Sequence, residues 1–307
     1  MSVTVFASPR FEEHTTPPGH PERPERAKAM ESAANRWRMK GGDVRDPRPA
    51  TREELARIHT PDYLNQVESV RGRPSQLDPD TYTSPESVEI AELAAGAAIE
   101  AARLARDGTP SFALVRPPGH HAEAGRAMGF CIFNNIAVAA ADLLASGTEK
   151  LAIVDIDVHH GNGTQWAFYA DPRVLFISSH QFPFYPGTGA LEETGSGLGK
   201  GFTINIPLAA GSGDAEYDRA YADIVQPALH AFVPEVLLIS AGFDTWIHDP
   251  LAGMRVTADG FARIFGRLRA AAAATCGSRV MLVTEGGYDL GGLEAGLTAG
   301  LHAFSTL

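Results

Sequence analysis

Cysteine is scarce in this sequence, which has two, Cys131 and Cys276, among 307 residues. Two distant cysteines argue against a disulfide framework and indicate a reducing cytoplasm. No run of about 18 apolar residues is present, so we expect no transmembrane helix and no membrane partner. The N-terminus lacks a basic region followed by an apolar stretch, so we expect no secretory signal. Together these absences predict a cytoplasmic protein.

The sequence also has fewer basic than acidic residues. It has 26 Lys and Arg and 37 Asp and Glu, which gives a formal net charge of −11. An acidic protein is poorly suited to the phosphate backbone, so we expect no direct nucleic-acid partner. The charge is compatible with cationic partners such as lysine-bearing peptides or polyamines. The Gly-rich stretch 187–201 has no Lys-Ser/Thr in the spacing of a phosphate loop, which argues against nucleotide binding.

Short apolar, β-branched runs alternate with Ala-rich helical patterns along the chain. Near-continuous apolar runs, such as Val236-Leu237-Leu238-Ile239, are typical of strands buried on both faces. The expected strands are 111–115, 151–158, 174–178, 202–206, 236–240 and 280–284, and the expected helices are 87–106, 134–145, 214–232 and 258–274. This alternation predicts an α/β fold with a mostly parallel central sheet flanked by helices. No linker or repeat divides the chain, so we expect residues 1–307 to form a single domain.

The N-terminal quarter of the chain is less regular. It is rich in proline and arginine, as in Pro17, Pro18, Pro21, Arg23 and Pro24. We interpret it as a long surface segment, followed by a helix near residues 25–38.

Polar residues follow several of the expected strands at the point where each strand ends. In an open α/β sheet, ligands bind at the carboxyl ends of the strands. The segments are Arg116-Pro-Pro-Gly-His-His121, His159-His160-Gly161-Asn162-Gly163, Ala241-Gly-Phe-Asp244 and Glu285-Gly-Gly-Tyr288. Their convergence predicts an active site at this edge of the sheet.

A metal site is indicated by Asp155, Asp157 and His159, which occupy alternate positions and would share one face of a strand. Two buried carboxylates and an imidazole without a cation would be costly, which favours a metal over a buried polar network. Asp244 can supply a further ligand, although Asp is also common as a helix cap or turn residue. Carboxylate and imidazole ligands suit zinc, iron, cobalt or manganese, and a catalytic zinc needs about three of them.

Three other kinds of residue bear on the chemistry. The tandem His120-His121 follows a rigid turn, and it suits a general base and acid, metal ligands or unrelated loop residues. Tyr288 follows two glycines and is either a hydrogen-bond donor to an oxyanion or an ordinary half-buried tyrosine. Cys131 is better interpreted as a buried structural residue than as a nucleophile.

Several motifs together resemble those of zinc-dependent histone deacetylases. The motifs are the four strand-exit segments, Gly129-Phe-Cys131, the full run Asp155-Ile-Asp-Val-His-His-Gly-Asn-Gly163, Tyr185-Pro-Gly-Thr-Gly189 and Ser240-Ala-Gly-Phe-Asp244. They span roughly residues 20–300 in the order found in that family. The sequence is most similar to the class II enzymes and their bacterial relatives, which include acetylpolyamine amidohydrolases and acetoin-utilisation proteins. The resemblance implies an arginase/deacetylase-type α/β fold.

The resemblance also implies catalytic roles. Asp157, His159 and Asp244 would be the ligands of one catalytic zinc ion. His121 would be the general base and acid, with His120 as its electrostatic partner. The remaining catalytic residues implied are Asp155 paired with His120, Asn162 facing the second histidine, and Tyr288 as the oxyanion donor.

Substrate contacts follow from the same resemblance. Phe130 and Tyr185 would form aromatic walls of an acyl-lysine tunnel, and the Gly129 carbonyl would accept the substrate amide. The other substrate-binding residues implied are Asp80 at the rim, Leu251 at the position of an acidic gatekeeper in polyamine-preferring relatives, Gly287 beside Tyr288, and Arg26 at an acetate exit channel.

One or two structural potassium ions are implied as well. The first would use Asp155, Asp157, His159, Ser178 and Ser179. The second would lie near Phe168, Asp171 and Val174. In this interpretation Asp155 supports the site and binds potassium, whereas alternation alone had grouped it with the zinc ligands.

The expected function is a zinc-dependent amidohydrolase that removes acetyl or acyl groups with a metal-activated water. Its partner would be an acetylated lysine peptide or protein, or a small acetylated amine. Leu251 offers no charge to a polyamine, so an acetylpolyamine amidohydrolase is the alternative. Further alternatives are an arginase-like dimanganese ureohydrolase, against which Trp246 stands where a further acid would be wanted, and a non-catalytic acyl-amine binding protein. The oligomeric state stays open, a homo-oligomer included.

Overall fold

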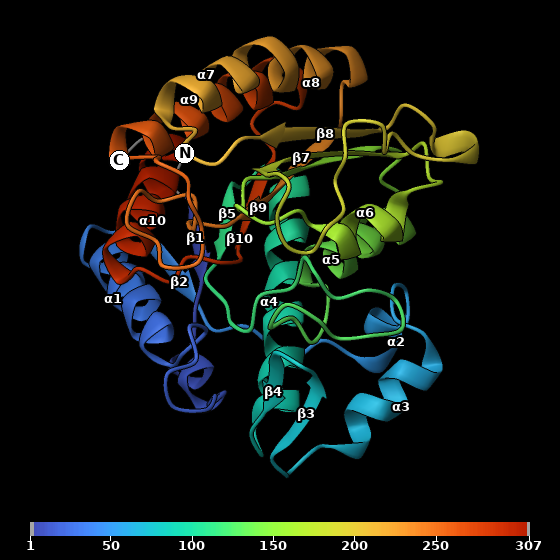
Figure 1. The fold of residues 1–307 in the computed structure, drawn as a ribbon, viewed down its shortest axis with the longest axis vertical. Coiled ribbons are helices and arrows are strands. Elements are labelled where there is room, and N and C mark those ends of the chain that lie inside the picture. The colour runs from blue at the N-terminus through green and yellow to red at the C-terminus, as the bar shows by residue number, and fades with distance from the viewer. Residues whose placement is uncertain (1–2, 306–307) are drawn as a thin grey trace.

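The centre of the fold is an eight-stranded sheet in which all adjacent strands are parallel. The computed structural model describes residues 3–305. The strand order is β2-β1-β5-β10-β9-β6-β7-β8 (Figure 1). The strands are β1 (Thr4–Phe6), β2 (Asp43–Arg45), β5 (Ser111–Ala113), β6 (Leu151–Asp155), β7 (Val174–Gln181), β8 (Thr203–Leu208), β9 (Val236–Ala241) and β10 (Val280–Thr284). The predicted α/β fold with a parallel sheet is confirmed.

Helices cover both faces of this sheet (Figure 1). One face carries α4 (Ser87–Arg106), α5 (Asn135–Ala145) and α6 (Asn162–Phe168), with α2 (Arg52–Leu55) and α3 (Pro61–Ser69) beyond them. The other face carries α1 (Glu25–Met39), α7 (Asp214–Ala220), α8 (Gln226–Phe232), α9 (Ala258–Thr275) and α10 (Leu290–Phe304). A π-helical turn, η3 (Tyr221–Val225), joins α7 to α8, so the helix predicted at 214–232 is one helical run with an irregular middle. The remaining elements are the 3₁₀ turns η1 (Pro9–Glu13) and η2 (Gly197–Gly199) and the antiparallel hairpin β3 (Ser75–Asp78) and β4 (Thr81–Thr83).

Alternate side chains of each strand enter two separate hydrophobic cores. In β9, Leu238 belongs to the core beneath α4 and α5, whereas Ile239 belongs to the core beneath α9 and α10. Every residue of β9 is buried. A strand that is covered on both sides has no polar face, and this explains the near-continuous apolar runs in the sequence.

The four strands that are followed by polar motifs are neighbours in the sheet. Their order is β5-β10-β9-β6, so the motifs leave the sheet side by side. The register pairs Asp155 at the end of β6 with Ser240 near the end of β9. Parallel pairing thereby brings segments that are far apart in sequence to one edge, as predicted.

The interpretation of 151–158 as a strand is wrong at its end. Strand β6 ends at Asp155, and Asp157 and His159 lie in the loop that follows it. The backbone N–H of Asp157 donates to Asp155 Oδ1 at 3.1 Å, which turns the chain away from the sheet ladder. A shared strand face therefore does not bring these side chains together, and the tight loop does so instead.

The interpretation of the N-terminal quarter as a surface segment is also wrong in part. Residues 17–19 are exposed, but Glu22 and Arg26 are fully buried. Strand β1 lies inside the sheet between β2 and β5. A three-residue strand is too short to show a periodic pattern, so the sequence did not reveal it. The helix expected near 25–38 is confirmed as α1.

Two predicted absences can be compared with the described residues. Among residues 3–305, no helix is long and apolar enough to cross a membrane. Cys131 and Cys276 are both free and buried, so they form no disulfide, as predicted.

The packing of α4 yields a test of the fold. A Cβ atom at Gly96 would lie 1.8 Å from the Arg48 carbonyl oxygen, whereas nothing lies within 4 Å of a Cβ at Gly266 in α9. We expect Gly96→Ala to lower the free energy of unfolding by about 1–3 kcal/mol, because rigid backbone must move. Gly266→Ala, the matched control, should raise it by about 0.5–1 kcal/mol through helix propensity. Urea unfolding measures both, and a stabilising Gly96→Ala would contradict the packing described.

Candidate active site

Asp157, His159 and Asp244 form a buried cluster of metal-binding atoms. Their ligand atoms all lie within 4.8 Å of one another. His159 Nδ1 is 3.1 Å from Asp157 Oδ1 and 3.2 Å from Asp244 Oδ2. The two aspartates come from the loops that follow the neighbouring strands β6 and β9. The structure thus brings together the three residues that the sequence pointed to, without Asp155.

Backbone donors hold both carboxylates in place. Asp157 Oδ2 accepts the Gly286 N–H at 2.8 Å, and Asp244 Oδ1 accepts the Val158 N–H at 2.9 Å. Glycine is needed for this approach, since a Cβ at Gly286 would lie 2.2 Å from Asp244 Oδ2. Each carboxylate is therefore oriented on one side and presents an oxygen to His159 on the other.

The charges of the cluster fit a divalent cation. Burial and the neighbouring Asp157 raise the pKa of Asp244 to about 7. Burial alone would lower the pKa of His159, but the two carboxylates outweigh it and raise it to about 10. Two buried carboxylates thus require positive charge between them. Two carboxylate oxygens and an imidazole are a suitable ligand set for zinc, which leaves a coordination position for substrate or water.

The tandem histidines lie in different electrostatic surroundings, although their ring centroids are 4.0 Å apart. His120 Nδ1 donates to Asp155 Oδ2 at 2.9 Å. Burial alone would lower the pKa of His120, but Asp155 and Asp157 raise it well above its usual value. Burial lowers the pKa of His121 far below its usual value, and the positive charges of His120 and His159 add to this. At neutral pH His120 is therefore charged and His121 is neutral.

Asn162 determines which ring nitrogen of His121 carries the proton. Its Oδ1 lies 2.7 Å from His121 Nδ1, and its Nδ2 donates to Glu123 Oε1 at 2.8 Å. Because an amide oxygen only accepts, Nδ1 of His121 must be the donor. The other nitrogen, Nε2, is then free to accept a proton.

Two buried carboxylates that we did not predict as functional hold the loops that carry the tandem histidines and Tyr288. Glu285 Oε2 accepts the N–H groups of Gly119 at 2.6 Å and His120 at 3.1 Å. Asp249 Oδ2 accepts the N–H of Tyr288 at 2.7 Å. In the sequence, Glu285 stood out only as the first residue of the Glu285-Gly-Gly-Tyr288 motif, and Asp249 was assigned no role. Their partners are 39 or more residues away, so no local pattern reveals them.

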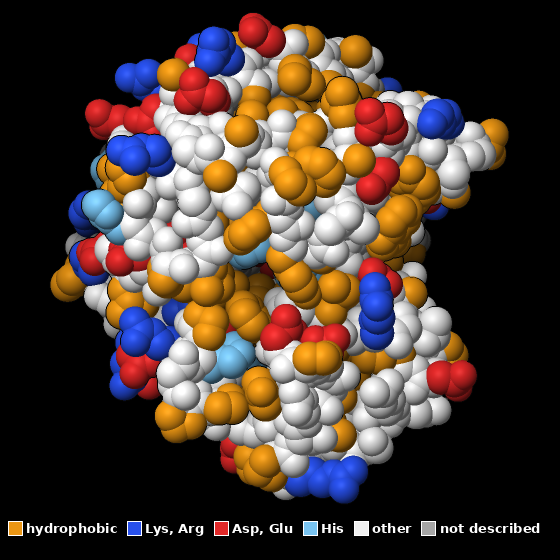
Figure 2. Space-filling view, viewed as in Figure 1, with side chains coloured by type: hydrophobic (Ala, Val, Ile, Leu, Met, Phe, Trp, Pro, Cys, Tyr) orange, Lys and Arg blue, Asp and Glu red, His pale blue; other side chains and the backbone are white. Residues whose placement is uncertain are grey.

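A cavity of about 240 Å³ opens onto this cluster. It is lined by Asp80, His121, Gly129, Phe130, His159, Phe184, Tyr185, Leu251 and Tyr288. All but Phe184 were expected at the site. The Phe184 ring stacks on His159 with centroids 5.5 Å apart, and it lies next to Tyr185 in the sequence. In Figure 2 the middle of the face shown is hollowed, and hydrophobic and acidic side chains gather around the hollow.

The β3–β4 hairpin supports one wall of this cavity. Asp80 Oδ1 accepts the Gly129 N–H at 3.1 Å, and Thr81 Oγ1 accepts the Phe130 N–H at 3.2 Å. Gly129 and Phe130 both have positive φ, 58° and 68°. The left-handed turn brings the Phe130 ring edge-on to Tyr288, at a centroid distance of 5.8 Å. The Asp80 carboxylate, at the rim, thus supports a wall of the cavity and also faces the cavity.

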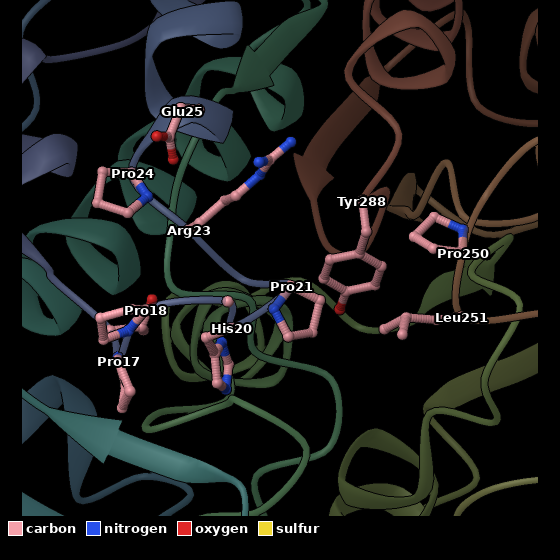
Figure 3. Close-up of a pocket in the computed structure, with 12 residues that line it drawn as sticks. Pro17, Pro18, His20, Pro21, Arg23, Pro24, Glu25, Pro250, Leu251 and Tyr288 are labelled. Atoms are coloured by element: carbon pink, nitrogen blue, oxygen red, sulfur yellow. The ribbon is translucent and has the colours of Figure 1, made fainter.

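A second cavity, of about 580 Å³, adjoins the first at Leu251 and Tyr288 (Figure 3). Its other wall is the proline-rich segment 16–25. Arg26 is buried behind Tyr288, where its Nε donates to the carbonyl of Gly287 at 2.8 Å. The three residues Arg26, Gly287 and Tyr288 are therefore brought together.

The residues predicted for potassium lie in two places. Ser178 is paired with Asp155 in the β6–β7 register, and Ser179 Oγ lies 3.5 Å from the Asp155 carbonyl oxygen. Phe168, Asp171 and Val174 form the turn between α6 and β7, where Asp171 N–H donates to the Phe168 carbonyl at 3.0 Å. The first group adjoins the metal cluster, and the second lies at the opposite end of β7.

Two further buried histidines hold the loop that carries Tyr185. His160 Nδ1 bonds Thr188 Oγ1 at 2.8 Å, and His180 Nε2 donates to the Gly189 carbonyl at 2.9 Å. Burial lowers the pKa of His160 to about 3 and that of His180 to about 4. Both rings are therefore neutral at pH 7 and act as fixed hydrogen-bonding groups.

Comparison with known proteins finds that this chain is similar to deacetylases. The profile of the histone deacetylase domain matches residues 20–304. A probable deacetylase of Archaeoglobus fulgidus is 41% identical over 297 residues, which cover 95% of this chain and 83% of that protein. A histone deacetylase-like amidohydrolase of Pseudomonas aeruginosa is 41% identical over 279 residues, 88% of this chain and 73% of that one. The crystal structure of the HDA15 HD domain superimposes with a TM-score of 0.93 at 39% identity, covering 99% of this chain and 90% of that one.

Three of the buried histidines predict a contribution to stability that is lost in acid. The folded-state pKa values of His59, His160 and His180, about 4, 3 and 4, lie below the ordinary value of 6.5. At these three positions the unfolded chain therefore binds more protons below pH 6.5, so the stability that these histidines contribute is full above that pH and is lost as the pH drops toward 4. Each histidine contributes up to about 1.4 kcal/mol per pH unit.

Urea unfolding between pH 7.5 and 4.5 measures this dependence. We expect His160→Gln to flatten the dependence relative to the wild type, because one titrating group is removed. The exposed His302 serves as the matched control, and His302→Gln should keep the wild-type dependence. Equal slopes for His160→Gln and the wild type would contradict the neutral, buried state of His160.

Proposed function

The chain belongs to the histone deacetylase family, and on that premise we propose that it hydrolyses the acetyl amide of acetyl-lysine or a related acetylated amine with the help of zinc. The observation that carries the proposal is the convergence of three elements on one cavity. These are the metal-binding cluster, the neutral imidazole of His121 and the phenol of Tyr288. Amide hydrolysis needs all three: activation of water, proton transfer and stabilisation of an oxyanion.

Asp157, His159 and Asp244 would hold the zinc ion. Zinc bound there would supply Lewis-acid activation of the acetyl carbonyl and of a water molecule. The protein orients its ligands in advance, because the N–H groups of Gly286 and Val158 fix the two carboxylates.

His121 moves the proton. With Nδ1 bonded to Asn162, its Nε2 takes the proton of the attacking water and passes it to the leaving amine. The positive charge of His120, which Asp155 stabilises, matters for the second proton transfer. A neighbouring positive charge makes protonated His121 a stronger acid, so it readily gives the proton to the amine.

Tyr288 stabilises the oxyanion with a hydrogen bond from its hydroxyl. Burial raises the pKa of Tyr288 well above its usual value, although the nearby Arg26 acts in the opposite direction. The phenol is therefore protonated at neutral pH and can donate. Asp249 Oδ2 accepts the backbone N–H of Tyr288 at 2.7 Å, and this hydrogen bond limits the positions that the Tyr288 ring can take.

Substitutions at the two catalytic side chains test the mechanism. We expect Tyr288→Phe and His121→Ala each to lower kcat on an acetyl-lysine peptide by about 10²-fold or more. Neither substitution removes a zinc ligand, so both variants should keep the wild-type zinc content, measured by mass spectrometry of the purified protein. Near-normal turnover in either variant would refute the assigned role. Two manganese ions per chain instead of one zinc would favour the ureohydrolase alternative.

Substrate choice rests on Leu251 and Asp80. Leu251 lines both cavities beside Tyr288 and offers no partner for an ammonium group. Asp80 at the rim is suited to binding the backbone N–H groups of a peptide. We therefore favour acetylated lysine in a peptide or protein over an acetylated polyamine.

The ratio of kcat/KM for an acetyl-lysine peptide and acetylputrescine measures this preference. We expect the wild-type protein to prefer the peptide, and Leu251→Glu to raise the relative activity on acetylputrescine by about 10-fold, because a carboxylate attracts the second ammonium. Leu251→Gln is the matched control, since it is polar but uncharged. A wild-type preference for acetylputrescine would support the polyamine alternative.

Three further proposals concern the surroundings of the site. Potassium bound by Asp155, Asp157, His159, Ser178 and Ser179 is supported by the clustering of these residues, and a second ion near Phe168, Asp171 and Val174 by their shared turn. A single catalytic domain is supported by the eight-stranded sheet, which contains strands from β1 near the N-terminus to β10 near the C-terminus. A cytoplasmic location is supported by the two free cysteines.

A further inference from the structure

Two arginines from separate segments bond to the same buried carboxylate, that of Glu22. Arg116 donates from Nε to Oε1 at 2.8 Å and from Nη2 to Oε2 at 2.7 Å, a bidentate pair. Arg26 donates from Nη1 to Oε1 at 2.8 Å. All three side chains are 0% exposed, so water does not compete for these bonds.

The remaining donors of Arg26 hold the loop that carries Tyr288. Its Nε donates to the Gly287 carbonyl at 2.8 Å, and its Nη2 donates to the Glu285 carbonyl at 2.5 Å. Its guanidinium carbon lies 5.1 Å from the centroid of the Tyr288 ring. A cation at this distance is attracted to the ring face and makes the hydroxyl a better donor.

Arg116 opens the segment that leads to His120 and His121. Its Nη1 donates to the carbonyls of Phe11 at 2.7 Å and His14 at 2.6 Å, so it ties this segment to the N-terminal region. Glu22 therefore lies between the support of the proton-transferring histidine and the support of the oxyanion donor.

The charges make Glu22 necessary to this arrangement. Its single carboxylate faces the guanidiniums of Arg26 and Arg116, which repel each other strongly in a buried setting. His14 Nε2 lies 3.4 Å from Glu22 Oε2. Burial lowers the pKa of His14, so its imidazole is neutral, and the positive charges that face Glu22 are those of the two arginines. Loss of the Glu22 charge would push the two guanidiniums apart and move the groups that they hold.

The same residue anchors the wall of the larger cavity. Thr16 Oγ1 donates to the Glu22 carbonyl at 2.7 Å, and the His20 ring meets Phe130 edge-on at a centroid distance of 4.7 Å. Figure 3 shows Pro21, from the same segment, beside Tyr288. Glu22 thus lies at the base of a segment that contacts both the tunnel wall and the phenol.

We propose that Glu22 is a positioning residue, whose carboxylate holds Arg26 and Arg116 together and thereby keeps the Tyr288 hydroxyl aligned with His121. The proposal rests on the proposed function, because it concerns the same site. Glu22 touches neither the substrate cavity nor the metal-binding cluster, so it acts through the two arginines.

A double-mutant cycle tests this role. Glu22→Gln keeps the size of the side chain and removes its charge. We expect it to lower kcat on an acetyl-lysine peptide by about 10- to 100-fold, because small misalignments of reacting groups are costly, and to change KM by less than about threefold. In a Tyr288→Phe background one of the two groups that Glu22 aligns is gone, so the same substitution should lower kcat by a clearly smaller factor than it does in the wild type.

A matched control separates positioning from general destabilisation. Asp142 is also a buried carboxylate that bonds two arginines, Arg57 at 2.6 Å and Arg103 at 2.8 Å, but it lies on α5 and lines neither cavity. Asp142→Asn should reduce the melting temperature and leave kcat within about twofold of the wild type. A Glu22→Gln effect on kcat no larger than that of Asp142→Asn, or an equal fold-loss with and without the Tyr288 hydroxyl, overturns the proposal.

Hydrogen exchange gives a readout that does not depend on turnover. Amides of residues 285–289 should exchange faster in Glu22→Gln than in the wild type or Asp142→Asn, because their loop is held through Arg26. If the wild type hydrolyses no acetylated amine, the proposed function fails, and unchanged exchange would separately overturn the role of Glu22. If Glu22→Gln does not fold, Glu22→Asp replaces it in the double-mutant cycle. Glu22→Asp keeps the charge but is one methylene too short to reach both arginines, so we expect the same dependence on the Tyr288 hydroxyl with a smaller loss of kcat.

Discussion

The compensation of buried negative charge is the constraint on which the rest of this site depends. Asp157 and Asp244 are 0% exposed and lie close enough for burial and their mutual repulsion to raise the pKa of Asp244 to about 7. Such a pair is stable only with positive charge between its oxygens. His159 contributes to that compensation, and a divalent cation would complete it. The suitability of this cluster for a metal ion is therefore a consequence of how the protein buries these two groups.

Other buried carboxylates determine the positions of the loops around this cluster. Glu285 accepts the N–H groups of Gly119 and His120, and Asp249 accepts that of Tyr288. Glu22 bonds to Arg26 and Arg116, which lie in two separate segments. Loops at strand ends have unpaired backbone donors, and a buried carboxylate satisfies several of them at once. The side chains around the metal-binding cluster are thus positioned by a polar network whose members come from distant parts of the chain.

The two adjacent histidines show how the surroundings produce different chemistry from the same side chain. His120 is paired with Asp155 and carries a charge, whereas burial, together with that neighbouring charge, lowers the pKa of His121 and keeps it neutral. Asn162 then leaves Nε2 of His121 as the accepting nitrogen. A carboxylate in place of Asn162 would have raised the pKa of His121, so the uncharged amide favours a ring that can both accept and release a proton.

The sequence by itself determined the parallel sheet and most of its strands and helices, because buried strands and their polar exits are local patterns. It also indicated the residues of the metal cluster, but alternation along an expected strand grouped Asp155 with them, and only the resemblance to histone deacetylases removed it. It did not reveal β1, whose three residues are too few to show a pattern, or the end of β6 at Asp155, where a backbone hydrogen bond turns the chain. The partners of Glu22 were equally hidden, since Arg116 lies 94 positions away. Composition indicates which side chains can be buried, but the groups that they meet depend on how strands distant in sequence pair and pack, and only the tertiary structure decided that.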